Sequence, residues 1–219
     1  MIPPPARPET DPRAIGVPRI VSRGFHKLQH ALHEFEIDPA GMTCVDLGAS
    51  VGGFTQCLLA FGAAHVTALD TARGVLDYLV RRDEHVTVLE RTNALHAEAT
   101  TAAGLVVVDL GWTPQRLALP AARRWLAPGG RIVSLIKPHY EAKAEHVLGD
   151  DDAHQITQRT LDEVGGLGFE MLGLARSPIA GSRRRGSSAG KGGGNAEWLA
   201  LFGDDPRAQP GAADAQPDS

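Results

Sequence analysis

The sequence has 219 residues, of which 42% are hydrophobic and 5% aromatic. This length supports one well-buried core and little more, and the few aromatic residues argue against a stacking platform such as an RNA-recognition motif. Acidic residues outnumber basic ones, 26 to 22, so any polyanion site has to be a local basic patch.

The cysteines, the apolar stretches and the composition of the two ends predict the cellular location and the domain limits. Cys44 and Cys57 lie in apolar runs, which predicts buried thiols in a reducing compartment. No apolar stretch approaches membrane-spanning length, and the N-terminus has no apolar signal core, so we expect a cytoplasmic protein without membrane contact. Residues 1–18 are expected to be a flexible Pro-rich lead, 19–202 one domain, and 203–219 a disordered acidic tail.

The predicted elements alternate along the chain. Ser22 is expected to cap a helix that carries Leu28, Ala31, Leu32 and Phe35 on one face. Strands are expected at 43–47, 66–69, 86–89, 105–110, 131–136, 169–174 and 197–202, and further helices at 53–61, 72–82, 114–126 and 153–165. Such alternation predicts a doubly wound, mostly parallel seven-stranded α/β sheet with helices on both faces. The last strand follows a long loop, so we expect it to run antiparallel as an insert or an edge.

A glycine-rich turn is the strongest local motif. The stretch VDLGASVGGFT at 45–55 follows the first strand and opens a helix. Gly48 permits a tight turn, while Gly52 and Gly53 let backbone approach a ligand and let the helix pack closely on the strand. The spacing G-x-x-x-G-G differs from the G-x-G-x-x-G of dinucleotide sites, whose helix faces a pyrophosphate.

Acids at two strand ends suggest which cofactor this turn binds. Asp70 ends the second strand and suits a ribose diol, and Asp46 suits an ammonium group. Together they predict a site for S-adenosylmethionine (SAM), which carries both groups and no phosphate. A structural turn without a ligand is the less favoured alternative. The candidate cofactor residues are Asp46, Gly48, Ala49, Ser50, Gly52, Gly53, Phe54, Asp70, Thr92, Asn93 and Asp109.

Asn93 follows the third strand and has two equally weighted interpretations. Its amide either reads the adenine edge of the cofactor or satisfies the backbone of its own loop.

Six stretches, taken together and in order, resemble a known family. They are SRG at 22–24 with Lys27 and Leu28, DLGASVGGFT at 46–55, LERTNA at 89–94, LIKP at 135–138, SPI at 177–179 and GNAE at 194–197. The chain resembles the FtsJ-like ribose 2′-O-methyltransferases, and most closely the TlyA branch, whose members were historically labelled hemolysins. The resemblance implies a catalytic set of Lys27, Asp109, Lys137 and Glu197, SAM as cofactor and an RNA substrate, which we expect to be ribosomal.

Three departures from that branch affect the substrate prediction. The small N-terminal RNA-binding domain typical of the branch does not precede the matched stretches, which leaves the RNA target open. Residues 110–114 read LGWTP where the family prefers VSFIS, and 139–141 read HYE in place of QFE. The last two changes are expected to reshape the acceptor pocket.

The implied lysines suit the chemistry of a ribose hydroxyl. A 2′-hydroxyl is a weak nucleophile that needs in-line placement and help with its proton. Lys137 is expected to act as base or as hydroxyl-orienting group, with Lys27 as its like-charged neighbour. Asp109 and Glu197 would align the two ammonium groups. A neighbouring ammonium and desolvation lower a lysine's pKa, whereas carboxylates raise it. Taken singly, each of the four residues is also consistent with an ordinary solvated position.

Basic residues outside this set are candidates for RNA contacts. They are Arg23, Arg183, Arg184, Arg185 and Lys191, most of them in a Gly/Ser-rich loop that is equally consistent with a solvated loop. His26, His30 and His33 share a helix face, but they lack an appropriately spaced acid and no metal site is predicted. Two alternative functions remain at this point: a SAM enzyme with a small-molecule acceptor, and a non-catalytic RNA-binding protein with the SAM fold.

Overall fold

One mixed sheet organises the part of the chain that the structure describes. The computed structural model describes residues 19–181 and 194–204. Across these residues seven strands stand in the order β3-β2-β1-β4-β5-β7-β6. Their bounds are Thr43–Leu47 (β1), His65–Asp70 (β2), Val86–Glu90 (β3), Ala103–Val108 (β4), Leu126–Ile136 (β5), Phe169–Arg176 (β6) and Trp198–Asp204 (β7). The first five strands pair in parallel, and β7 runs antiparallel between β5 and β6.

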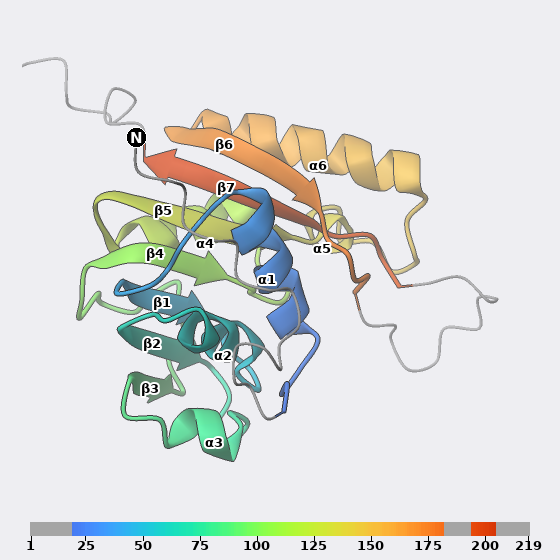
Figure 1. The fold of residues 1–219 in the computed structure, drawn as a ribbon. Helices are drawn as coiled ribbons and strands as arrows, with labels where there is room; N and C mark the ends of the chain where they lie inside the picture. The colour runs from blue at the N-terminus through green and yellow to red at the C-terminus, as the bar shows by residue number, and fades with distance from the viewer. Residues whose placement is uncertain (1–18, 182–193, 205–219) are drawn as a thin grey trace, which may run out of the picture.

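Helices cover both faces of the sheet (Figure 1). On one face lie α1 (Gly24–Glu34) and α2 (Gly53–Ala60), and on the other α4 (Gln115–Arg123) and α6 (Asp150–Gly165). The short α5 (Pro138–Glu141) lies near α6, and α3 (Tyr78–Arg81) lies beside β3. The arrangement confirms the predicted doubly wound α/β fold and the antiparallel insertion of the last strand.

Two apolar layers, one on each face of the sheet, hold the helices. Trp125 and Phe202 are fully buried in the layer under α4 and α6. Leu28 and Leu32 of α1 are buried in the layer that includes α2, as the apolar spacing predicted. Both cysteines are buried and free in this structure, and burial raises the pKa of the Cys44 thiol to about 12.

The predicted helix at 72–82 is wrong over most of its length. Only the turn Tyr78–Arg81 is helical, and Asp77 caps it by accepting a hydrogen bond from the Leu79 amide at 3.0 Å. Gly74 has a φ of +72°, outside the right-handed helical region, and its amide donates to Glu90 at 2.6 Å, while the Ala72 amide donates to Asp70 at 2.8 Å. The left-handed turn at Gly74 therefore interrupts the segment that the periodicity assigned to one helix.

Smaller corrections concern element ends. Arg23, without a side-chain cap, occupies the N-cap position of α1, whereas Ser22 Oγ accepts from the Gly24 amide at 3.2 Å. The strand predicted at 105–110 ends at Val108, and α4 ends at Arg123 because β5 already begins at Leu126.

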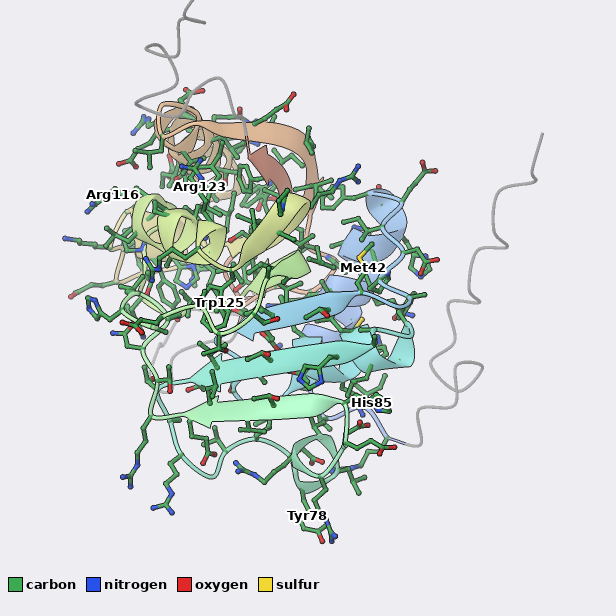
Figure 2. The ribbon with its side chains drawn as sticks, turned by 90° about the vertical axis from the view of Figure 1, so that its left-hand side faces the viewer. Met42, Tyr78, His85, Arg116, Arg123 and Trp125 are labelled. Atoms are coloured by element: carbon green, nitrogen blue, oxygen red, sulfur yellow. The ribbon has the colours of Figure 1, made fainter. Side chains whose placement is uncertain are left out.

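The parallel strands give the molecule two distinct edges. Figure 2 shows Met42 and His85 at the edge where the strands begin, and Arg116 toward the opposite edge. The order of strands reverses between β1 and β4, so the carboxyl ends of these two strands flank the position where ligands bind in open α/β sheets. Within residues 19–181 and 194–204, no helix is long and apolar enough to cross a membrane.

Candidate active site

A cavity of about 500 Å³ opens at the reversal point of the sheet. Seven predicted site residues line it: Gly48, Ser50, Asp70, Thr92, Asn93, Asp109 and Lys137. They follow five different strands, β1 to β5, whose carboxyl ends meet at one edge because the strands are parallel. The cavity therefore joins the predicted cofactor residues to two members of the predicted catalytic set.

The glycine-rich turn needs its glycines for close packing. A Cβ on Gly48 would lie 2.7 Å from the carbonyl oxygen of Asp109, so only glycine lets β1 end beside the end of β4. Gly52 has a φ of +95°, and a Cβ there would lie 2.8 Å from Leu76. Gly52 and the remaining predicted members of this turn, Ala49, Gly53 and Phe54, are buried and are not among the lining residues of the cavity.

Asp70 is held by backbone amides of the two loops that flank it. One carboxylate oxygen accepts from the Ser50 amide at 2.7 Å, and the other accepts from the Ala72 amide at 2.8 Å. Neutral donors orient this carboxylate without cancelling its charge, so it keeps a net negative charge at the cavity wall.

Asp46 lies beneath the cavity and is completely buried. Its Oδ2 accepts from the Thr55 hydroxyl at 2.6 Å, whereas Oδ1 is buried and has no hydrogen-bond partner within the described residues. Burial raises the pKa of Asp46 to about 7, and the nearby charges of Asp109 and Asp70 act in the same direction. A buried carboxylate with an unused oxygen next to other acids fits a cationic ligand, which would stabilise its charged form.

Thr92 and Asn93 form the wall at the end of β3. The Thr92 amide donates to the Asp70 carbonyl oxygen at 3.0 Å, which ties the β3 end to the β2 end. Asn93 Oδ1 accepts from the Leu95 amide at 2.9 Å. The amide oxygen of Asn93 therefore accepts a hydrogen bond from its own loop. Its NH₂ group can still donate a hydrogen bond to a ligand, so the two sequence interpretations are compatible.

Two lysine–carboxylate pairs occupy the other half of the site. Lys137, at the end of β5, donates to Asp109 Oδ1 and lies 3.5 Å from the Leu110 carbonyl oxygen. Lys27 of α1 donates to Glu197, which precedes β7. The second pair is nearly inaccessible, with side-chain exposures of 10% for Lys27 and 3% for Glu197.

The two pairs influence each other electrostatically. Burial raises the pKa of Glu197, while the charges of Lys27 and Lys137 lower it and that of Asp109 raises it. His139 senses the same lysines: burial first, then Lys137 and Lys27, lower its pKa to about 4. Its imidazole is consequently neutral at physiological pH. The fold thus brings together all four residues of the predicted set, which come from positions 27 to 197 of the chain.

Four cavity residues were not among the sequence predictions: Leu69, Thr71, Ala94 and Leu95. They lie at or within five residues of the end of a parallel strand, and this position was the signal that could have found them. The other lining residues, Leu110, Gly111, Trp112 and Thr113, belong to the segment 110–114 that was expected to reshape the acceptor pocket. Trp112 is 62% exposed and lies at one of the departures from the family pattern.

The remaining predictions concern RNA and metal. Arg23 is exposed at the start of α1, whereas Arg183, Arg184, Arg185 and Lys191 lie outside the described residues. No group of three or more His, Cys, Asp or Glu side chains suited to a metal ion occurs within residues 19–181 and 194–204.

Similarity to known proteins agrees with this geometry. The profile of the FtsJ-like methyltransferases matches residues 20–185. The 16S/23S rRNA (cytidine-2′-O)-methyltransferase TlyA of Mycobacterium tuberculosis is 41% identical over 170 residues, which cover 74% of this chain and 63% of that protein. Hemolysin A of Brachyspira hyodysenteriae is 32% identical, with 84% of this chain and 77% of that protein covered.

A solved structure gives the same result in three dimensions. A Lactococcus lactis protein described as a hemolysin superposes with a TM-score of 0.74 at 35% identity, covering 85% of this chain and 89% of that one. This chain spans less than two thirds of the mycobacterial enzyme's length. The profile match, over residues 20–185, covers most of the chain, and so the chain belongs to the FtsJ-like methyltransferase family.

Proposed function

We propose that this protein transfers a methyl group from SAM to a ribose 2′-hydroxyl of RNA, with ribosomal RNA as substrate. The observation that carries the proposal is the meeting of Lys27, Glu197, Asp109 and Lys137 beside a cavity bordered by acids. The first pair comes from α1 and the segment before β7, and the second from the ends of β4 and β5. Such convergence of charged residues from distant parts of the chain is typical of an active site.

The residues at the ends of β1, β2 and β3 fit SAM. Asp70 suits the ribose hydroxyls, the Asn93 NH₂ suits the adenine edge, and the buried Asp46, when ionised, suits the ammonium of the methionine part. When bound, SAM supplies an electrophilic methyl group on a sulfonium centre. Gly48 lets the turn after β1 pack against the Asp109 carbonyl at the end of β4, at the reversal point of the sheet where the ligand would lie.

Lys137 is positioned to act on the acceptor hydroxyl, either by taking its proton or by orienting its oxygen. It lines the cavity, and its ammonium donates to Asp109 and approaches the Leu110 carbonyl. In its neutral form Lys137 takes the hydroxyl proton as the oxygen attacks; in its charged form it orients the oxygen lone pair. Either role contributes through positioning, and general-base catalysis typically contributes about 10²- to 10⁴-fold in rate.

The Lys27–Glu197 pair supports this lysine from the closed side of the site. Both partners are buried, so their charges act through a medium of low polarity and are poorly screened. Lys27 supplies a second positive charge near Lys137, and Glu197 balances it. We propose that this pair sets the electrostatic potential at Lys137 and does not itself touch the acceptor.

The nature of the acceptor rests on the relatives. The mycobacterial relative is named as a 16S/23S rRNA (cytidine-2′-O)-methyltransferase, and the lysines and acids that suit a ribose hydroxyl are all present here. We therefore propose ribosomal RNA, with cytidine as the first nucleotide to examine. Two buried free thiols are consistent with action in the reducing cytoplasm.

A labelled transfer assay tests the proposal. The protein is incubated with methyl-labelled SAM and ribosomal RNA, free and in subunits, from cells that lack ribose methylation. Label should appear in RNA, at a position that resists alkaline cleavage because its 2′-oxygen is blocked. Lys137→Ala should abolish the label, and Arg131→Ala, an exposed change in the middle of the same strand, should not.

Negative results separate the alternatives. SAM binding in calorimetry without label in any RNA would indicate a small-molecule acceptor. Absence of both SAM binding and transfer would indicate a non-catalytic protein of the same fold.

A further inference from the structure

A second cavity of about 430 Å³ adjoins the cofactor cavity and shares Trp112 with it. Its apolar walls come from Trp112, Pro114, Leu117 and Tyr140. Neither Asp109 nor Lys137 lines it, although Lys137 Nζ lies 5.6 Å from the centroid of the Tyr140 ring, so the second cavity lies next to the catalytic lysine on the side of Tyr140. The mechanism proposed above makes no use of this cavity.

Its apolar walls are unusually exposed. Trp112 is 62% exposed and Leu117 is 43% exposed, although both are large apolar side chains. The rings of Trp112 and Tyr140 lie with their centroids 4.3 Å apart and their planes 30° from parallel. Adjacent exposed aromatic and aliphatic groups in a hollow mark a binding surface, and aromatic faces are the partners on which unpaired nucleobases stack.

The backbone around this cavity is held in a disfavoured conformation at two points. Trp112 has a φ of +59° and Lys143 a φ of +52°, a region that residues other than glycine rarely adopt. Ser50, which lines the cofactor cavity, has a φ of +50°. Such strain costs on the order of 1–3 kcal/mol per residue and is concentrated at ligand sites.

Charged groups at the second cavity suit a nucleotide. Arg116 and Lys143 are cations on its wall, and Glu145 is an acid on the same wall. Arg116 also pairs with Glu163 at 3.5 Å, but both side chains are about half exposed, so this pair contributes little and can yield to a phosphate. A carboxylate such as Glu145 can accept a hydrogen bond from the exocyclic amine of a base.

We infer that this cavity binds the base of a nucleotide adjacent to the methylated one, stacked on Trp112 on the side away from Tyr140, with its phosphate near Arg116 and Lys143. The inference rests on the proposed function. The methylated ribose has to reach Lys137 in the first cavity, and a chain continuing past Trp112 brings the neighbouring nucleotide to the second cavity. RNA-binding enzymes commonly unstack single nucleotides in this way and stack them on aromatic side chains.

Tryptophan fluorescence offers a direct test without catalysis. The chain has three tryptophans, and Trp125 and Trp198 are buried at 0% and 6% exposure, so Trp112 is the one open to solvent and ligand. A short oligocytidylate should quench Trp112 emission and protect it from iodide. An abasic ribose-phosphate chain of equal length has the same charge and no bases, and it should do neither. Trp112→Phe should remove the signal and keep most of the affinity.

Steady-state kinetics with ribosomal RNA then tests whether a base binds at Trp112. Trp112→Ala should raise the KM for RNA roughly 5- to 150-fold, the equivalent of losing one base-stacking contact, with a smaller change in kcat. Replacing both Arg116 and Lys143 by alanine should raise KM and flatten its salt dependence. Tyr78→Ala and Arg82→Ala are the matched controls, because both residues are exposed near α3, and Figure 2 shows Tyr78 far from Arg116. Neither control should change KM.

The outcomes distinguish this inference from the proposed function. Quenching by oligocytidylate in a protein that methylates no RNA would retain the base site and reject the function. Methylation of RNA with an unquenched Trp112 and an unchanged KM in Trp112→Ala would retain the function and overturn the base site. A loss confined to kcat would also overturn the inference, because it would place the methylated nucleotide's own base on Trp112.

Discussion

The two halves of the site use carboxylates in opposite ways. At the ends of β1 and β2, Asp46 and Asp70 are hydrogen-bonded to a hydroxyl and to backbone amides, all of them neutral donors. At the ends of β4 and β5 and before β7, Asp109 and Glu197 are paired with lysines. Neutral donors orient an acid without supplying a counter-charge, so a bound cation would stabilise the ionised form of Asp46, whose pKa burial raises, whereas an ammonium already balances Asp109 and Glu197. The first half is thus prepared for a cation, and the second for a hydroxyl whose proton has to be moved or oriented.

The largest effect should come from the lysine that borders the cavity. We expect Lys137→Ala to reduce methyl transfer by about 10²- to 10⁴-fold and to leave SAM affinity nearly unchanged, since SAM is held by the other half of the site. Lys137→Arg should not restore the rate if the lysine is a base, because arginine stays protonated. Single-turnover rates at saturating SAM and RNA measure this step. An arginine variant with near-normal turnover would leave Lys137 as an orienting cation.

The buried pair should show what its charges contribute to folding. Glu197→Gln leaves the Lys27 ammonium buried without its counter-charge, and loss of one partner of such a pair typically costs about 3–5 kcal/mol of unfolding free energy. A double variant, Lys27→Met with Glu197→Leu, should recover most of that stability and remain inactive. Denaturant unfolding and the transfer assay measure the two properties. If the double variant were active, the pair would be purely structural.

The acid on the cofactor side should act on SAM binding alone. Asp70→Ala removes a charged acceptor from the cavity wall, and we expect SAM affinity to fall roughly 10- to 100-fold, as for hydrogen bonds to charged groups. Asp83→Ala, a change of the same type on the loop before β3, is the matched control. Calorimetry gives both affinities. Equal SAM binding by Asp70→Ala and the unaltered protein would remove Asp70 from the cofactor site.

The last prediction concerns pH and Asp46. Because burial raises the pKa of Asp46 from 3.8 to about 7, the folded state favours its protonated form. The contribution of this group to stability is therefore greatest at low pH and declines as pH rises from about 4 to about 7. Asp46→Asn should remove that decline in unfolding measurements without SAM. Saturating SAM should offset the decline in the unaltered protein, and a failure to do so would separate Asp46 from the cofactor's ammonium.

Much of this protein was determined by local sequence patterns. Continuous runs of Val, Ile and Leu between helical stretches predicted the doubly wound sheet, and the long loop before residue 198 predicted the antiparallel β7. These predictions succeeded because both signals are local. A strand buried on both faces is a continuous run of apolar residues, and a missing crossover helix is a loop-like run of consecutive residues. The helix at 72–82 failed for the opposite reason. Gly74 takes a left-handed conformation in which its amide donates to Glu90, a residue outside that segment.

The site residues show the same division between local sequence patterns and tertiary contacts. Motif spacing alone proposed Asp46, Asp70 and the glycine turn, because a strand–turn–helix is a local unit. Which residues meet was decided only by the tertiary structure. The pairing of Lys27 with Glu197 spans 170 positions, and it exists because β7 inserts beside β5 and packs near α1. The Trp112–Tyr140 cavity likewise arises where loops after two neighbouring parallel strands converge, and side-chain contacts between such loops are not encoded in the periodicity of either one.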